Sequence, residues 1–290
     1  MEKYANLKPW FGLGSKIVPE MERKEILIAS RANWKIDAVP MVGRYRGHII
    51  ETDHVALVRS DTTKVIEVVS TSWRPVQNET LLETILEYQK NGLLRIEAGG
   101  VFNEGQEVWF LCATDLTVKV GSDVVRGYLL VVNPHRYGYA PSARLLLMSE
   151  DNSALSVRLD NPRQGIDQKS HRQSFDIENM QTNVDAMHET FDRYAKLMTE
   201  AQKTKVDPET YYRALYDIPD GMTDRLAATL DLAKERKAKT AWQAFGVLLT
   251  LHNHEFGHGR STRLYSVWMG GYAKFLDRAL RFSVASKLGA

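Results

Sequence analysis

The sequence has one cysteine, Cys112, in 290 residues, which excludes an intrachain disulfide and any zinc site built from cysteines. Its place in the strand-like run 107–114 predicts a buried thiol rather than a catalytic nucleophile. Apolar runs such as 128–132 and 247–249 are far shorter than the ~20 residues that span a bilayer. No secretory signal is recognisable near the N-terminus. We therefore expect a protein of the reducing cytoplasm without a membrane span.

Complete catalytic motifs are also missing. Gly99-Gly100 and Gly270-Gly271 lack the spacing of a dinucleotide fingerprint, and there is no phosphate-binding loop. No Gly-x-Ser-x-Gly elbow surrounds any serine. We therefore expect no cofactor, and we do not expect an enzyme.

The sequence has no large excess of charge of either sign, with 38 lysines and arginines against 36 aspartates and glutamates. The formal net charge is +2, with 43% hydrophobic and 26% charged residues, a composition typical of a folded globular chain rather than a polycation. Nucleic-acid binding would therefore have to come from a local basic patch.

Alternating and β-branched patterns dominate the first half. They predict strands near 34–38, 55–59, 65–69, 93–101, 106–114, 116–120, 124–132, 143–148 and 154–159. Gly121-Ser-Asp123 is typical of a tight hairpin link. One helix precedes the strands, at about 19–32, and a second interrupts them at 78–90, where Asn78 is a candidate cap.

Helical periodicity replaces alternation after Asn161-Pro-Arg-Gln-Gly165. It predicts a long helix at 175–203, a shorter one opened by Asp207-Pro208, and helices near 222–239, 240–256 and 261–287. The expected fold class is α+β: antiparallel hairpins with one or two helices, followed by a helical C-terminal half. We predict a β-rich domain at 1–165 and a helical domain at 166–290, either separate or sharing one core.

The sharpest polar cluster is the segment 251–260, which contains His252, His254 and His258. On an unbroken helix, His254 and His258 would share a face as metal ligands do, with Glu255 between them. Gly257 and Gly259 oppose an unbroken helix, so we favour a polar helix end and expect no metal. A structural metal or phosphate contact and a hydrolytic metal centre are the alternatives.

Basic residues gather around the junction between the two halves, interleaved with Tyr137 and Tyr139. Arginine grips phosphates and aromatic rings stack on bases, the combination that single-strand binders use. The candidate nucleic-acid contacts are Arg136, Arg144, Arg158, Arg163, Lys169 and Arg172. A solvated charged surface is the competing interpretation.

Several short blocks resemble the phage/plasmid-like protein family, domain of unknown function 932. They are Pro9-Trp-Phe-Gly-Leu-Gly14, the stretches 68–79, 99–109 and 128–135, Thr240-Ala-Trp242 and Tyr265-Ser-Val-Trp-Met-Gly270. The chain departs from the family pattern at His135-Arg-Tyr-Gly138 and along 144–152. The resemblance implies a protein of a phage or another mobile element.

The first functional hypothesis is a phage DNA-metabolism protein that binds single-stranded DNA, in annealing or recombination. The order of hairpins, helix and strands is similar to that in the cores of single-strand annealing proteins. The alternative is a protein-binding module that inhibits or decoys a host defence or restriction system. We also expect a homo-oligomer, with Met180, Met187 and Met198 offering adaptable apolar surface.

Overall fold

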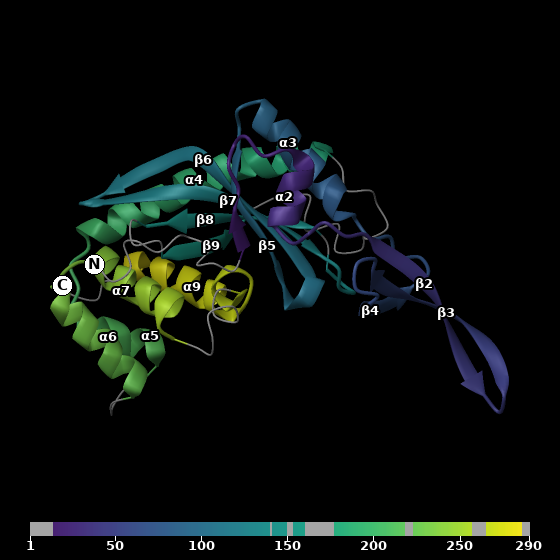
Figure 1. The fold of residues 1–290 in the computed structure, drawn as a ribbon. Coiled ribbons are helices and arrows are strands. Elements are labelled where there is room, and N and C mark those ends of the chain that lie inside the picture. The colour runs from purple at the N-terminus through teal and green to yellow at the C-terminus, as the bar shows by residue number, and fades with distance from the viewer. Residues whose placement is uncertain are drawn as a thin grey trace.

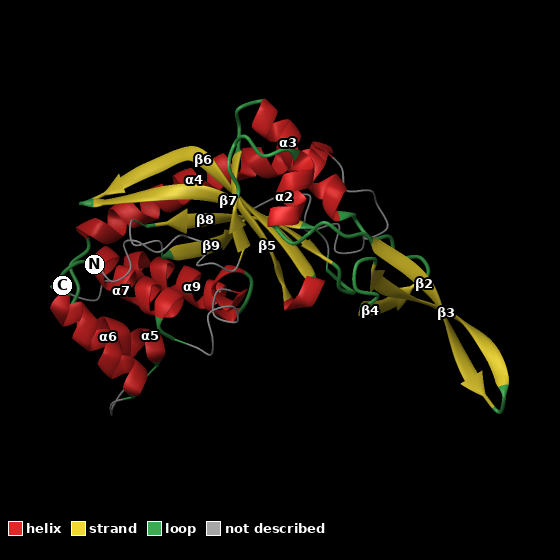
Figure 2. Ribbon diagram, viewed as in Figure 1, coloured by secondary structure: helices red, strands yellow, loops and turns green. Residues whose placement is uncertain are grey.

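The structure is a computed structural model that describes residues 14–139, 141–149, 153–159, 177–217, 223–256 and 265–285, with side chains from 184 onward in the fourth range. Figure 1 shows a strand-rich first half followed by helices, and Figure 2 shows the same view by type of element. The predicted α+β class, with antiparallel strands before a helical half, is confirmed. No helix in these ranges is both long and apolar enough to cross a membrane.

The larger sheet, sheet A, has six antiparallel strands in the order β1-β5-β6-β7-β8-β9. Their bounds are β1 Gly14–Lys16, β5 Arg95–Phe102, β6 Glu107–Val120, β7 Asp123–Pro134, β8 Ser142–Met148 and β9 Ala154–Arg158. Gly121, at φ 63°, and Ser122 form the predicted tight turn, since Val120 pairs with Asp123. Side chains 107–112 of β6 are buried on both faces, which identifies β6 as a central strand. Because β6 runs from Glu107 to Val120, the two predicted strands 106–114 and 116–120 are a single strand.

The smaller sheet, sheet B, contains β2 Ile36–Tyr45, β3 His48–Arg59 and β4 Val65–Ser70 in the order β2-β3-β4. The β2–β3 hairpin turns at Arg46 and Gly47, both with positive φ (48° and 84°), as a two-residue hairpin turn requires. Figure 1 shows this hairpin projecting from the body of the molecule, and we call sheet B the arm. Sequence patterns predicted strands here but not a projecting hairpin.

The helices are α2 Arg23–Ala29, α3 Asn78–Lys90, α4 Ile177–Lys203, α5 Pro208–Tyr216, α6 Asp224–Glu235, α7 Ala241–His254 and α9 Gly271–Ala285. Asp207, Thr223 and Thr240 cap α5, α6 and α7 through side-chain oxygens. The predicted cap of α3 is wrong. Gln77 is its N-cap residue, and the Asn78 side chain instead donates to the carbonyls of Ala32 and Trp34.

One buried cluster contains side chains of both halves, from Ile17 of the first to Leu280 of α9. The proposed boundary near 165 lies outside the described residues and stays a prediction. Met187 and Met198 are each 1% exposed, so they belong to this core and offer no surface to a partner. The Met180 side chain is not among those described.

His252 is enclosed by aromatic rings inside the helical half. The ring centroids of Phe256, Tyr272 and Phe275 lie 5.1, 5.0 and 5.1 Å from that of the imidazole, and Nδ1 lies 2.9 Å from the Leu248 carbonyl oxygen. Burial lowers the pKa of His252 from 6.5 to about 4, because the charged imidazolium loses its hydration there.

This burial predicts a loss of stability in mild acid. In the unfolded chain His252 takes up a proton below about pH 6.5, whereas in the folded chain it stays neutral down to about pH 4. The contribution of neutral His252 to the free energy of unfolding is therefore fully present above pH 6.5 and is lost as the pH falls from 6.5 to 4. The unfolding free energy should fall by about 2 kcal/mol from about pH 7 to about pH 5. Denaturant titrations of the His252→Phe variant should show a shallower fall. His48→Phe, at an exposed position, is the control; an equal fall in both variants would contradict the assignment.

Candidate functional site

A buried carboxylate marks the end of sheet A where β6 begins and β7 ends. Glu107 is 3% exposed, and its two oxygens accept from three groups. The Asn103 amide donates to Oε2 at 2.8 Å, and the Arg136 guanidinium and the Tyr265 hydroxyl donate to Oε1 at 3.0 and 3.3 Å. Through this hydrogen bond Glu107 raises the pKa of Arg136 above its usual range. A buried charge is tolerated here because it is paired and hydrogen-bonded.

The turn before Glu107 has an unusual backbone. Asn103, Glu104 and Gly105 have successive positive φ values of 47°, 57° and 116°, a conformation that ordinary side chains rarely adopt. The Arg59 guanidinium donates to the Glu104 carbonyl at 2.7 Å and also pairs with Asp61. Such strain persists only where surrounding contacts enforce it, and it concentrates at functional positions.

The segment after β7 presents two exposed rings beside an arginine. Tyr137 and Tyr139 are 66% and 53% exposed, and the Arg136 guanidinium carbon lies 4.9 Å from the centroid of the Tyr139 ring. Exposed aromatic faces next to arginine are the elements on which unpaired bases stack. Arg136 itself is only partly available, since its charge is already paired with Glu107.

Two arginines lie opposite each other on β8 and β9. Arg144 and Arg158 are direct cross-strand partners, so their side chains leave the same face of sheet A. Arg144 is partly buried and donates from Nε to the Ser156 hydroxyl at 3.0 Å. Burial, and then the Arg158 charge, lower the pKa of Arg144 below its usual range. Among the described residues neither arginine has an acidic partner.

Two like charges directly opposite each other destabilise a sheet, and desolvating one of them adds to the cost. An anion shared by the two guanidinium groups would relieve both effects, because arginine matches the geometry of phosphate and carboxylate oxygens. The arginine pair is therefore a candidate anion site.

The strand register relates this pair to the buried carboxylate. Leu130 of β7 pairs with both Leu111 and Arg144, and Leu111 shares a face of β6 with Glu107 and Trp109. A helical turn at 265–268 covers this face: Tyr265 bonds Glu107, and the Trp268 carbonyl accepts from Ser156 at 2.6 Å. Arg136 and the arginine pair thus flank one helical turn on one face of sheet A.

Of the six predicted nucleic-acid contacts, the structure brings Arg144 and Arg158 together and places Arg136 beside the same turn. Arg163, Lys169 and Arg172 lie outside the described residues. Sequence reasoning missed Glu107 and Tyr265. An acidic residue at the head of the apolar run Glu107-Val-Trp-Phe-Leu was a usable signal, because buried carboxylates need nearby donors.

The two described histidines of the segment 251–260, His252 and His254, have different surroundings. Helix α7 ends at His254, before Gly257, as predicted, and the His254 Nε2 lies 3.0 Å from the Ser153 hydroxyl. His252 is enclosed in its aromatic cage, and His258 lies outside the described residues. Within the described ranges, no three His, Cys, Asp or Glu side chains are grouped to hold a metal ion. Cys112 is buried as predicted, and burial raises the pKa of its thiol.

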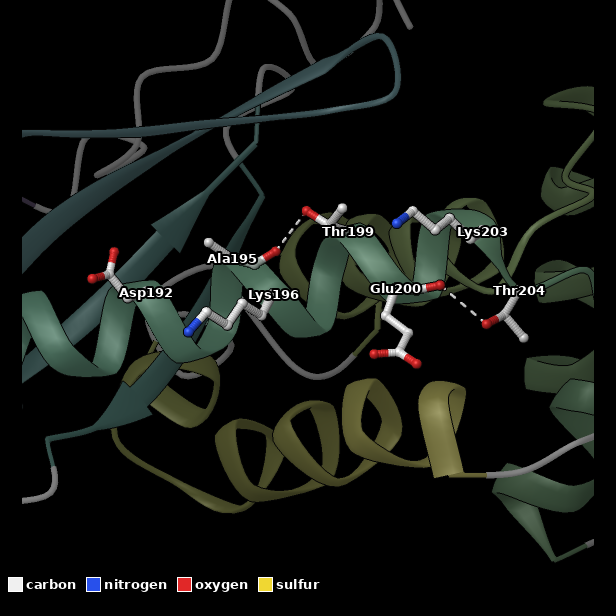
Figure 3. A pocket seen from close by; sticks show the side chains of 7 residues that line it. All are labelled: Asp192, Ala195, Lys196, Thr199, Glu200, Lys203 and Thr204. Carbon is white, nitrogen blue, oxygen red and sulfur yellow. Dashed lines mark hydrogen bonds between the residues drawn. The ribbon is translucent and has the colours of Figure 1, made fainter.

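A hollow on α4 carries no recognisable chemistry. Figure 3 shows its lining, which comes from this helix and the residue that follows it: Asp192, Ala195, Lys196, Thr199, Glu200, Lys203 and Thr204. Asp192, Lys196 and Glu200 alternate in charge at spacings of four, the pattern of a solvated helix surface. The hydroxyls of Thr199 and Thr204 both donate to carbonyls of α4.

Residues 65–136 match the family model described as Domain of unknown function (DUF932). This match confirms the resemblance recognised in the sequence, and it contains the blocks at 68–79, 99–109 and 128–135. It also contains Glu107, the strained turn and Arg136, whereas Arg144, Arg158 and Tyr265 follow it. No curated protein and no solved structure matches the chain.

The arginine pair predicts a substitution that stabilises the fold. Arg144→Met keeps an apolar stem but removes a desolvated charge facing Arg158, and the Ser156 hydroxyl keeps its bond to Trp268. We expect the unfolding free energy to rise by about 1 kcal/mol. Inorganic phosphate should raise the melting temperature of the parent protein and much less that of the variant. Arg126→Met, at an exposed position on β7, is the matched control. Destabilisation by Arg144→Met would contradict the repulsive pair.

Proposed function

We propose that this chain, whose residues 65–136 match the domain-of-unknown-function family 932, binds single-stranded DNA in the host cytoplasm for a phage or another mobile element. The activity that fits best is strand annealing or recombination, which needs bound strands whose bases stay accessible. No cofactor or metal enters this proposal.

The observation that carries the proposal is the arginine pair. Arg144 and Arg158 present two guanidinium groups without an acidic partner in the described part of the chain, and a backbone phosphate supplies the missing negative charge. Tyr137 and Tyr139 are exposed and precede β8, the strand that contains Arg144, so unpaired bases could stack on their rings. Phosphate contacts and ring stacking carry no base code, which suits a protein that must accept many sequences.

The arginine pair predicts a specific salt dependence. Each phosphate contact releases condensed counterions, so the log of affinity for a single strand should fall by about 0.7 per contact for each unit of log salt. Arg144→Ala with Arg158→Ala should therefore flatten that slope by roughly 1.4 and weaken all sequences alike. Fluorescence anisotropy with labelled oligonucleotides across a salt series measures both quantities. Arg126→Ala should leave the slope unchanged. An unaltered slope in the double variant would exclude the pair as the contact, and no binding by the parent protein at low salt would exclude the function.

The tyrosines predict a different signature. Tyr137→Ala and Tyr139→Ala should each weaken single-strand binding by about 1–3 kcal/mol, because each removes a stacking face. The salt slope should stay the same, since no charge is lost. Double-stranded DNA, whose bases are already stacked, should be affected much less. Tyr45→Ala removes an exposed ring at the end of β2, in sheet B rather than sheet A, and is the control. Equal losses on single and double strands would argue against stacking.

The second candidate is a protein-binding module that inhibits or decoys a host defence or restriction system. The observation that favours it is the arm, which exposes apolar side chains such as Val42 and Ile49. Such a module would bind its target through the arm and would not need the arginine pair. Loss of activity on substituting the arm, with the Arg144 and Arg158 variants unaffected, would identify this function instead of DNA binding.

A further inference from the structure

The outer part of the arm is a two-stranded ribbon with open edges (Figure 1). We call residues 41–50 the distal arm and the rest of sheet B its root; every side chain of the distal arm is exposed. β2 is an edge strand, and β4 pairs with β3 only at residues 54–58, so no described strand borders the distal arm on either side. Open edges present unpaired backbone N–H and carbonyl groups. A partner therefore has to supply hydrogen-bonding groups, which the hydrocarbon of a lipid bilayer lacks.

The distal arm contains cations but no carboxylate. Its formally charged residues are Arg44 and Arg46, and neither has an acidic partner among the described residues. The root and its flanks mix both signs, with Lys35, Asp37, Glu51, Asp53 and Glu67 and with the ion pairs Arg59–Asp61 and Lys64–Glu104. The arm as a whole is therefore close to neutral, but its projecting end is positive. Such an end suits an anionic partner.

Gly43 leaves a gap in one face of the distal arm. It pairs with Ile50, and the shift in the β2–β3 register lies before it, between Pro40 and Val42. Its φ is not positive, and the nearest atom that a Cβ would meet is the Ile50 carbonyl oxygen at 3.9 Å. The fold therefore does not require glycine here, although glycine weakens a strand. A strand glycine without such a need is typical of a place where a ligand approaches the backbone closely.

We propose that the distal arm enters the major groove of double-stranded DNA. That groove is about 12 Å wide and admits a two-stranded ribbon, whereas the minor groove is only about 6 Å wide. Arg44 and Gly43 lie on opposite faces of the ribbon, because Arg44 pairs with Ile49 and Gly43 with Ile50. Between two groove walls each face meets phosphates: the arginines pair with them, and at Gly43 the backbone itself approaches. The exposed Ile49 and Ile50 side chains can contact thymine methyl groups, which only the major groove presents.

This inference concerns duplex DNA and another part of the chain, so it does not depend on single-strand binding by the arginine pair. It is also a different use of the arm from binding a host protein. Binding of purified protein to DNA alone separates the two uses.

The arginines of the distal arm are tested with a short blunt-ended duplex, by fluorescence anisotropy across a salt series. The parent protein should bind, and Arg44→Gln with Arg46→Gln should flatten the slope by about 1.8, since each contact with double-stranded DNA contributes about 0.9. Lys119→Gln with Arg126→Gln, both exposed on β6 and β7, is the matched control and should leave the slope unchanged. The arm variant should keep the affinity of the parent for single strands, so the two proposals fail separately. No duplex binding at low salt, or an unaltered slope in the arm variant, would overturn the inference and leave the arm to a protein partner.

Gly43→Val tests the close approach without changing charge. The free energy of unfolding should stay equal or rise, because a β-branched residue suits a strand better than glycine. Duplex affinity should nevertheless fall about tenfold, the scale of an overpacked contact. Thr117→Val, exposed on β6, adds a similar side chain elsewhere and should have no effect. A Gly43→Val protein that binds duplex as tightly as its parent would exclude the approach at this residue.

The groove itself is tested by chemical probing and by changing the duplex. Guanine N7 lies in the major groove, so its methylation by dimethyl sulfate should be reduced in the complex. A double-stranded RNA of the same sequence should bind much more weakly, because its major groove is deep and narrow. Unprotected N7 positions, or equal affinity for the RNA, would overturn insertion into the major groove.

Discussion

The pairing of β6 with β7 is the constraint on which the rest of the molecule depends. These strands are buried on both faces over most of their length, and the tight turn at Gly121-Ser122 holds their register. A slip by one residue would move Glu107 and Trp109 to the opposite face, away from Tyr265 and Trp268. The arginine pair is aligned by the same register through β8. Fold and candidate site are therefore consequences of one ladder.

Sequence patterns predicted an element best where one of its sides is buried or where a residue such as glycine marks its end. The bounds of α3 follow from its apolar stripe and from Asn91-Gly92, and α7 ends before Gly257 as expected. The distal arm was missed because both of its faces are exposed and no alternation of burial is imposed there. Its turn residues, Arg46-Gly47, are also a weaker hairpin signal than Asn-Gly.

The candidate site was predictable in composition but not in geometry. The arginines and tyrosines of 136–158 could be recognised as suited to nucleic acid, and their role stays a prediction. That Arg144 faces Arg158, or that Arg136 is held by Glu107, depends on strand pairing between distant segments. No local periodicity contains that information. The role of Asn78 was also not predictable from local sequence. As a helix-start residue it suggested a cap, whereas its side chain links the carbonyls of Ala32 and Trp34 to the imidazole of His135.

Several side-chain contacts hold the root of the arm to the body of the molecule. The Gln77 amide bonds both the N–H and the carbonyl of Ile36, each at 3.0 Å, as a neighbouring strand would. Asn78 holds the Trp34 carbonyl and accepts from His135, and Arg59 lies 4.4 Å above the Trp34 ring. The direction of the projection is thus settled when the chain folds. A binding partner has little orientational entropy left to remove, so more of the contact energy remains as affinity.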